Sequence, residues 1–517
     1  MDFVTKIKSH SHFKFSIMLA ASVAVLSSFL LIGAGSPGLN TELISIGVDG
    51  QAGGGDAYYV GSDITAGAVS ADGRFVVFSS LAENLTDDDV SGWHIYLRDR
   101  ATDTTTLVAD GSNSGGSPVI SADGQFIAFR SLSNQLVAND TNGIVDVFLY
   151  ERATGSIKRV SVASDGSEGT GCSCGWPDTC NGCEYDNVHS HPSISGDGRY
   201  ITFTSFSSNF VDGDLPDTPD VFVHDIVTGE TSIISRASDG NLGNAGSGES
   251  SISTDGNSIV FSSAATNLIA EDWNDQQDVF LWQRGEVGLT RVSVASDGSE
   301  GNSTSTDPVI SADGKRIVFT SGATTLSNQD TNGFVYDVFL YDLDKATTTI
   351  LSSGLSGGGD WPAISDNGQS VSFNSGSDDV YLFNTVTGQR QLINERMQHS
   401  ALNEDGSALV LSGYDNMLAI DTNNDKDVYL VSLDGQEPPD GEEPPVDEEP
   451  PVDEEPPIGD DGQPVPIDDT ASTAGDDGSS SSACSYDPNG RFDPVLPVLL
   501  LLAIAYLGWE LKKKRTE

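Results

Sequence analysis

A short motif recurs seven times between residues 70 and 406, and this repetition constrains the fold more than any other feature of the chain. Each copy starts with Ser-x-Asp-Gly or a close variant and continues with an alternating apolar run, an acidic loop, Asp-Val-Phe or a relative of it, and usually a Thr-Gly turn. The starting residues are Ser70, Ser121, Ser195, Ser253, Ser311, Ser365 and Asn403. A period of about 50 residues indicates a ring or a stack of small sheets.

The second copy shows most clearly which strands one repeat contains. Short apolar or alternating segments occupy residues 118–121, 126–129, 146–150 and 158–162, and residues rich in Gly, Asp and Asn separate them. Segments of this length and alternation are typical of β-strands. Four antiparallel strands in each of seven repeats predict an all-β, seven-bladed β-propeller over residues 40–435.

The seventh copy lacks a fourth strand, because its third strand is followed directly by a Pro- and Glu-rich segment. A spare copy of the fourth strand lies near the front of the chain, where residues 43–50 resemble residues 160–166 of the second repeat. We therefore expect residues 42–48 to complete the last blade and close the ring, which also removes two exposed strand edges.

The repeats resemble the TolB-type, WD-repeat-like propeller family through Ser-x-Asp-Gly, Phe-x-Ser and Asp-Val-Phe-x-Tyr-Asp. The resemblance covers about residues 40–435 and implies the fold. It does not imply one activity, because members include scaffolds, accessory domains of peptidases and a few lyases.

The charge balance limits the partners of this chain. Its 77 acidic and 25 basic residues give a formal net charge of −52. Such a surface repels nucleic acid and anionic lipid and attracts cations, so a DNA or RNA partner is excluded. Solubility, for example in a saline environment, is the simpler explanation of the acidity, and specific cation binding is the alternative.

The two ends of the chain are typical of an exported protein. Residues 1–35 combine a basic leader, an apolar run and small residues, as in a signal peptide, although an uncleaved anchor has the same features. Residues 436–483 predict a disordered acidic, Pro-rich stalk. Residues 495–509 are apolar and precede a basic tail, which would place this segment in the inner membrane, at least transiently, and the repeats outside it.

The C-terminal residues 484–517 resemble the tripartite sorting signals of Gram-negative bacteria, in which a rhombosortase-type protease removes the tail and the protein reaches the cell surface. Cys484 would then lie at the processing point. The Gly-Gly motif of the better-known version is absent, and a short permanent anchor is the alternative.

The loops between the second and third strands are acidic in most copies. Oxygen ligands at alternating positions suit Ca²⁺, although no loop has the complete twelve-residue EF-hand pattern. Turn formation and capping of backbone N–H groups are the plainer role for Asp and Asn in loops. The candidate calcium ligands are Asp421, Asn423, Asp425 and Asp427, which form the strongest set, with Asp140, Asn142, Asp146, Asp330 and Asn332.

Four cysteines cluster in residues 167–190, an insertion between the second and third repeats: Cys172, Cys174, Cys180 and Cys183. In an exported protein such a cluster most often forms two disulfides, and a zinc knot is the alternative.

One register position suggests a ligand site. The residues six positions before each turn Asp or Asn should surround the mouth of the central channel, and they include His191, Glu249, Asp307, Trp361 and His399. Imidazole and carboxylates could hold a transition metal or transfer protons. Polar residues also line solvated channels without any such role. No catalytic sequence motif occurs, so no catalytic residue is assigned.

These features favour an exported, envelope-anchored or surface-displayed propeller that binds a protein or a glycan on one face. A metal-dependent polysaccharide lyase that uses the channel mouth is one alternative. A periplasmic scaffold for a transport or assembly complex is the other.

Overall fold

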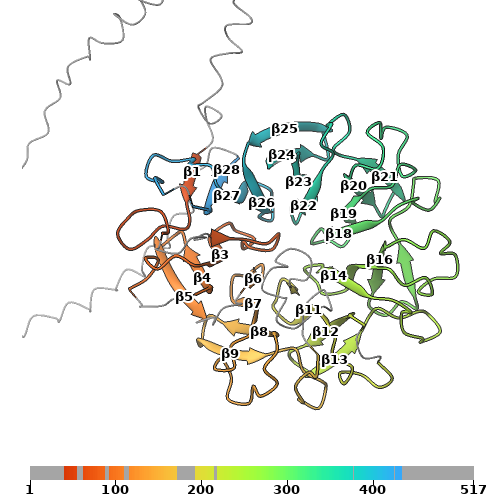
Figure 1. Cartoon of the computed structure of the whole chain (residues 1–517), viewed down its shortest axis with the longest axis horizontal. Helices are drawn as coiled ribbons and strands as arrows, with labels where there is room; N and C mark the ends of the chain where they lie inside the picture. Colours follow the sequence, from red (N-terminus) through yellow and green to blue (C-terminus); the bar gives the residue numbers. More distant parts are fainter. Residues whose placement is uncertain are drawn as a thin grey trace, which may run out of the picture. The chain divides into compact units, whose positions relative to one another are not determined.

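The computed structural model describes residues 40–54, 62–87, 92–109, 116–171, 192–214, 218–376, 378–423 and 425–433. These residues form seven four-stranded antiparallel sheets that follow one another around a central axis (Figure 1). The predicted all-β, seven-bladed propeller is therefore confirmed. No helix in these ranges has the length and apolar character needed to span a membrane. The leader, the cysteine cluster, the stalk and the C-terminal tail with Cys484 lie outside the described residues.

Blades 1 to 6 are each formed by four strands in sequence order, from the innermost to the outermost. Blade 1 contains β2 (Ser62–Asp63), β3 (Phe75–Ser80), β4 (His94–Asp99) and β5 (Thr104–Ala109). Blade 2 contains β6 (Gly116–Ile120), β7 (Phe126–Ser131), β8 (Asp146–Glu151) and β9 (Ser156–Arg159). Blade 3 contains β10 (Ser193–Ile194), β11 (Tyr200–Ser205), β12 (Asp220–Asp225) and β13 (Glu230–Ile233). Blade 4 contains β14 (Ser247–Ile252), β15 (Ser258–Ser263), β16 (Asp278–Gln283) and β17 (Leu289–Arg291).

The remaining blades continue the ring. Blade 5 contains β18 (Ser305–Ile310), β19 (Arg316–Ser321), β20 (Asp337–Asp342) and β21 (Thr347–Ile350). Blade 6 contains β22 (Asp360–Ile364), β23 (Ser370–Ser375), β24 (Asp379–Asn384) and β25 (Gln389–Asn394). Blade 7 contains β26 (Met397–Leu402), β27 (Ala408–Gly413), β28 (Asp427–Ser432) and, from the other end of the chain, β1 (Asn40–Leu43).

Strand β1 closes the ring by pairing antiparallel with β28, with Asn40 opposite Ser432 and Leu43 opposite Tyr429 (Figure 1). The predicted closing segment is confirmed, but the regular strand ends at Leu43 and not near residue 48. After Ser45 the chain turns back on itself, because Ile46 bridges to Ala52 and Gly50 adopts a φ of 76°.

The Ser-x-Asp-Gly motif is a self-contained turn between the first two strands of a blade. In blade 1 the Ser70 hydroxyl donates to Asp72 over 2.6 Å and accepts the backbone N–H of Phe75 over 3.0 Å. Gly73 has a φ of 71°, which favours glycine at this position. The motif recurs because each copy builds the same turn.

An aromatic pair lies at the centre of six blades. The second strand supplies a Phe, and the third strand supplies the Phe or Tyr directly opposite, as in Phe129 and Phe148, whose ring centroids lie 5.9 Å apart. Cross-strand aromatic pairs of this kind stabilise a sheet beyond the area that they bury. In blade 7 Leu411 faces Tyr429 instead.

Candidate functional site

Three of the predicted mouth residues share an unusual backbone conformation with Ser117, which stands at the same register position of blade 2. Ser117, Glu249, Asp307 and Trp361 have φ values of 55°, 53°, 51° and 48°. Each lies in an innermost strand where the register with the second strand shifts, as between Gly248 and Ser251. Positive φ is uncommon for residues other than glycine, and bulges redirect side chains at the rims of sheets. The bulge therefore orients these side chains at the channel mouth, which we define as the end of the channel where the innermost strands begin.

Two of these residues are in contact across the boundary between blades 4 and 5. The backbone N–H of Asp307 donates to Glu249 Oε2 over 3.0 Å, and the Ser262 hydroxyl donates to the same oxygen over 2.6 Å. Asp360 of blade 6 adds a further carboxyl group. Burial, together with the charges of Asp307 and Asp378, raises the pKa of Asp360 to about 6. Three carboxyl groups therefore lie on this side of the mouth.

The adjoining part of the mouth, in blades 6 and 7, has an aromatic–imidazole pair. The ring centroids of Trp361 and His399 lie 4.4 Å apart. His399 Nδ1 lies 2.6 Å from Asp63 Oδ1, and Lys426 Nζ lies 2.8 Å from Asp63 Oδ2. Burial acts against ionisation of Asp63, but the charges of Lys426 and His399 hold the pKa of Asp63 far below its usual value. His399 Nε2 is buried and has no hydrogen-bond partner in the described part of the chain.

Sequence analysis found Trp361 and His399 but missed Asp63, Asp360 and Lys426. Asp63 comes from blade 1, whereas His399 and Lys426 come from blade 7, so no local pattern connects them. His191 lies outside the described residues. The assignment of the mouth residues as a ligand site therefore stays a prediction.

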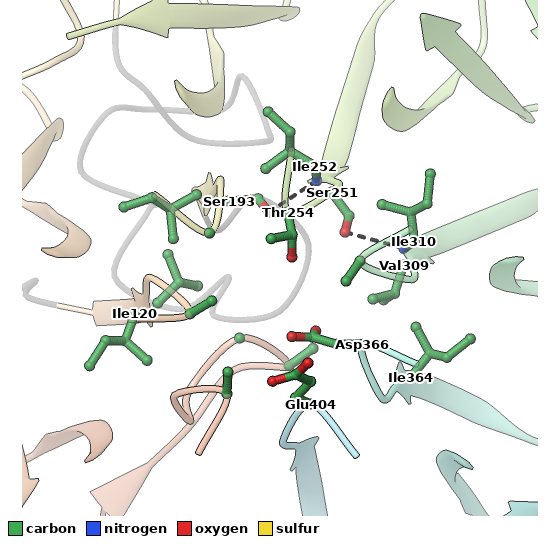
Figure 2. A pocket seen from close by; sticks show the side chains of 18 of the residues that line it. Ile120, Ser193, Ser251, Ile252, Thr254, Val309, Ile310, Ile364, Asp366 and Glu404 are labelled. Carbon is green, nitrogen blue, oxygen red and sulfur yellow. Dashed lines mark hydrogen bonds between the residues drawn. The ribbon is translucent and has the colours of Figure 1, made fainter. Parts of the chain in front are cut away.

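The opposite end of the channel is narrowed by the seven turns. Backbone hydrogen bonds join turn to turn, for example from Ala71 N to Ala122 O over 3.0 Å and from Glu404 N to Ala71 O over 3.2 Å. A cavity of about 100 Å³ lies behind them, lined mainly by aliphatic residues of the innermost strands. Figure 2 shows Asp366 and Glu404 next to each other among these side chains. Burial and the charge of Glu404 raise the pKa of Asp366 to about 6.

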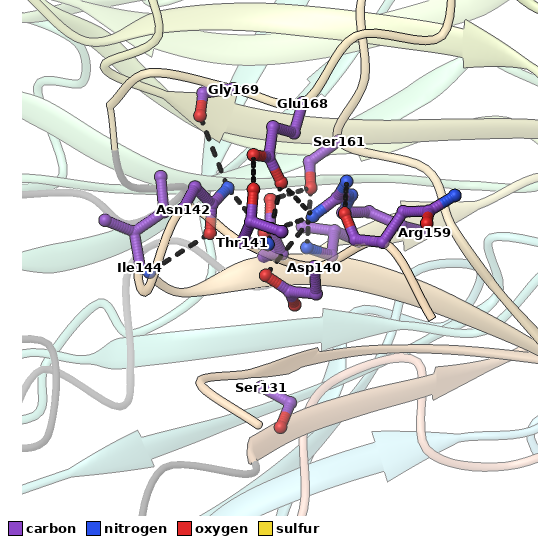
Figure 3. A network of polar contacts seen from close by, with 12 residues as sticks. Ser131, Asp140, Thr141, Asn142, Ile144, Arg159, Ser161, Glu168 and Gly169 are labelled. Carbon is purple, nitrogen blue, oxygen red and sulfur yellow. Dashed lines mark hydrogen bonds and ion pairs between the residues drawn. The ribbon is translucent and has the colours of Figure 1, made fainter. Parts of the chain in front are cut away.

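The predicted calcium loop of blade 2 already contains a cationic side chain. Arg159 Nη1 lies 3.3 Å from Asp140, 3.3 Å from Asp146 and 3.1 Å from Glu168 (Figure 3). The third predicted ligand, Asn142, donates to Asp146 Oδ2 over 2.9 Å. Because a guanidinium occupies the space between the carboxylates, no calcium ion is needed there to balance them.

Blade 4 repeats this arrangement. Arg291 Nη1 lies 3.6 Å from Asp272 and 3.2 Å from Asp278, and it also pairs with Glu300. The carboxylates of Asp272, Asp278 and Glu300 come within 4.8 Å of one another, a spacing that could also hold a metal ion. We call each such group of carboxylates, gathered at the loop between the second and third strands of a blade, its acid pocket.

The acid pockets of blades 5 and 7 contain the other predicted calcium ligands. In blade 5 the backbone N–H of Asn332 donates to Asp330 Oδ1 over 3.1 Å, and the Ser352 hydroxyl donates to Asp337 over 2.5 Å. In blade 7 Asp421 and Asp427 are buried, and the backbone N–H of Asp425 donates to Asn423 Oδ1 over 2.9 Å. No arginine or lysine pairs with these predicted ligands in the described ion pairs.

Comparison with known proteins places the chain among propellers. No family model and no curated protein matches it. An oligogalacturonate lyase in complex with manganese is 13% identical, with a TM-score of 0.50 over 78% of this chain and 98% of that chain. An oligogalacturonate lyase from Vibrio parahaemolyticus is 11% identical, with a TM-score of 0.49 over 77% and 98%. TolB from Acinetobacter baumannii is 16% identical, with a TM-score of 0.37 over 70% and 65%. At such identities the likeness shows the fold alone.

Proposed function

We propose that this protein is a binding module that takes a neutral or amino-bearing glycan at the channel mouth. The observation that carries this proposal is the Trp361–His399 pair beside the carboxyl groups of Glu249, Asp307 and Asp360. An aromatic face suits the apolar face of a sugar ring, and a few fixed polar groups then orient it. Carboxylates accept hydrogen bonds from sugar hydroxyl and amino groups.

The same charges disfavour an acidic polysaccharide. Lys426 is a cationic side chain at this part of the mouth, and its ammonium is already paired with Asp63. A uronate chain would bring its own carboxylates next to those of Glu249 and Asp307, and like charges in contact oppose binding. The lyase alternative is supported only by the shared fold of the manganese-bound lyase. Depolymerisation of a galacturonan by the purified protein would establish that alternative.

The sequence supports export to the cell envelope as the setting for this binding. The leader in residues 1–35, the stalk in residues 436–483 and the tail in residues 484–517 fit a propeller held at, or displayed from, the outer side of the inner membrane. A protein partner on the same face, as in a transport or assembly scaffold, is the runner-up to a glycan. We also propose that calcium, where it binds, has a structural role in the propeller and no catalytic one.

The test is a glycan screen with the purified propeller, followed by calorimetric titration of the best neutral or amino sugar. We expect Trp361→Ala to weaken binding by tenfold or more, because the aromatic surface is lost, and Asp307→Asn to weaken it less. Trp273→Ala is the matched control, because this tryptophan is 78% exposed on the acidic loop of blade 4. A preference for galacturonides, or equal losses in Trp273→Ala and Trp361→Ala, would refute the proposal.

A further inference from the structure

The acid pocket of blade 7 has the same framework as those of blades 2 and 4. In blade 7 the Ser45 hydroxyl donates to Asp427 Oδ1 over 2.5 Å, and Asn423 Nδ2 donates to Gly53 O over 2.8 Å. The corresponding bonds in blade 4 join Ser293 to Asp278 over 2.6 Å and Asn274 to Gly301 over 2.9 Å. The three pockets can therefore be compared position by position.

Blade 7 lacks the cation that fills the other two pockets. Arg159 and Arg291 each stand two residues before the serine of the framework. In blade 7 that position, two before Ser45, is occupied by Leu43, which is buried in the core. This position of blade 7 therefore supplies no guanidinium to its carboxylates.

The glutamate that accompanies each arginine has also been replaced. Glu168 and Glu300 stand in isolated bridges opposite Val162 and Val294. In blade 7 the equivalent bridge joins Ile46 to Ala52, so an alanine occupies the place of the glutamate. In these three blades the arginine and the glutamate are present together or absent together. This is expected if the role of the glutamate is to form an ion pair with the arginine.

The two aspartates nevertheless remain, and each has an oxygen without a partner. Asp421 is 4% exposed and Asp427 is fully buried. The Tyr429 hydroxyl donates to Asp421 Oδ2, and the Ser45 hydroxyl donates to Asp427 Oδ1. Asp421 Oδ1 and Asp427 Oδ2 have no hydrogen-bond partner within the described ranges. Buried carboxylate oxygens in this state require a cation or a proton.

The neighbouring lysine does not meet this requirement. Lys426 lies beside Asp427 in the sequence, but its ammonium is 2.8 Å from Asp63 at the channel mouth. None of the described ion pairs therefore places a cation between Asp421 and Asp427.

We propose that a divalent cation, calcium by its chemistry, binds between Asp421 and Asp427 in blade 7 and takes the place that arginine holds in blades 2 and 4. The two unpartnered donors, Asp421 Oδ1 and Asp427 Oδ2, are carboxylate oxygens. Hard oxygen donors in an irregular loop suit Ca²⁺, which tolerates flexible geometry, better than Mg²⁺ or a transition metal.

The position of this site gives the ion a role in ring closure. Asp427 begins β28, and its other oxygen is held by Ser45, directly after β1. An ion on Asp427 therefore stabilises the junction at which the first and last strands of the ring meet. This inference specifies the structural-cation part of the proposed function and does not depend on glycan binding.

The test uses the propeller after dialysis against EDTA, with CaCl2 then added in increasing amounts. At a calcium concentration of 100 times Kd, we expect the melting temperature to rise by about 4 °C. Asp421→Asn should abolish this rise, because one of the two free carboxylate oxygens is lost. Asp272→Asn is the matched control at the same position of blade 4, where Arg291 already fills the pocket, and it should keep the rise.

A second variant introduces the arginine and the glutamate of blades 2 and 4 at the equivalent positions of blade 7. Leu43→Arg combined with Ala52→Glu should remove the response to calcium and raise the melting temperature in EDTA. Equilibrium dialysis of calcium gives the stoichiometry directly and covers the case in which one variant fails to fold.

No calcium response in the wild-type protein would overturn the inference, and the remaining explanation would be a proton shared by the two carboxyl groups. A response that survives in Asp421→Asn would also overturn it. Glycan binding measured in EDTA tests the proposed function separately.

Discussion

Blades 4 and 7 form the same acid pocket from different chain connections. In blade 4 the second, third and fourth strands follow one another in the sequence, and Arg291 from the fourth strand pairs with Asp272 and Asp278. In blade 7 the fourth strand comes from the N-terminal end of the chain and brings Leu43 to the arginine position. Blade 4 thus carries its own cation, whereas blade 7, which closes the ring, has buried carboxylate oxygens that no described residue pairs with.

The largest expected effect comes from removing the closing strand. Deletion of residues 39–50 takes away β1, the buried side chains of Leu43 and Ile44, and the hydroxyl of Ser45. It also exposes the edge of β28. We expect a loss of unfolding free energy on the order of 5 kcal/mol or more, measured by urea denaturation. Unchanged denaturation would mean that ring closure contributes nothing to stability.

Loss of the arginine in blade 4 should have the next largest effect. Arg291→Met removes the arginine charge beside the buried Asp278 and the partly buried Asp272 and Glu300, which should cost about 3–5 kcal/mol. The double variant Arg291→Ile and Glu300→Leu copies blade 3, which has Ile233 and Leu242 at these positions, and should recover part of the loss. If both variants lose the same amount, the arginine contributes through packing and not through charge.

The framework serine allows a matched comparison of the two blades. Ser293→Ala and Ser45→Ala each remove a hydroxyl that donates to a buried aspartate. The same hydroxyl accepts the backbone N–H of the residue after that aspartate, so this hydrogen bond is lost as well. We expect each to cost about 2 kcal/mol in urea denaturation. A clearly larger loss for Ser45→Ala would show that the link between the chain ends carries more of the stability than the equivalent link within a blade.

The smallest expected effect is a dependence of stability on pH that arises from the acid pocket of blade 4. Burial and the charge of Asp278, opposed by Arg291, raise the pKa of Asp272 to about 6. The folded state therefore holds a proton that the unfolded state releases near pH 4, and stability falls as the pH rises from about 4 to 6. Asp272→Asn should gain about 1 kcal/mol at pH 8 and nothing at pH 4. A loss at pH 8 would show that Arg291 needs all three carboxylates.

Much of this architecture could be predicted from the sequence, because each part depends on local chemistry. The turn starting at Ser70 uses hydrogen bonds within six residues, so its copies can be counted. The Phe and Asp-Val-Phe segments pair across neighbouring strands of one blade, which yields the aromatic core. The closing strand was found because residues 43–50 keep the pattern of a fourth strand.

A signal for the arginine pockets was present in the sequence but was not used. Residues 159–169 and 291–301 are identical, from Arg to Glu-Gly, and only these two copies carry both charged residues. The matching segment after Leu43 differs at the same two places. Comparison of the fourth strands alone would have indicated that the acidic loops of blades 2 and 4 already have a cation.

The sequence by itself determined how many blades there are, how each turns, and which segment closes the ring, because these depend on contacts within a repeat. Only the tertiary structure decided which acids share a pocket and what neutralises them. Asp427 meets Ser45 across 382 positions, and Asp63 meets His399 across 336. Electrostatic balance depends on distance in space and not in sequence. Repeats that form the same turn can therefore differ in whether a described cation pairs with their carboxylates, as blades 4 and 7 do.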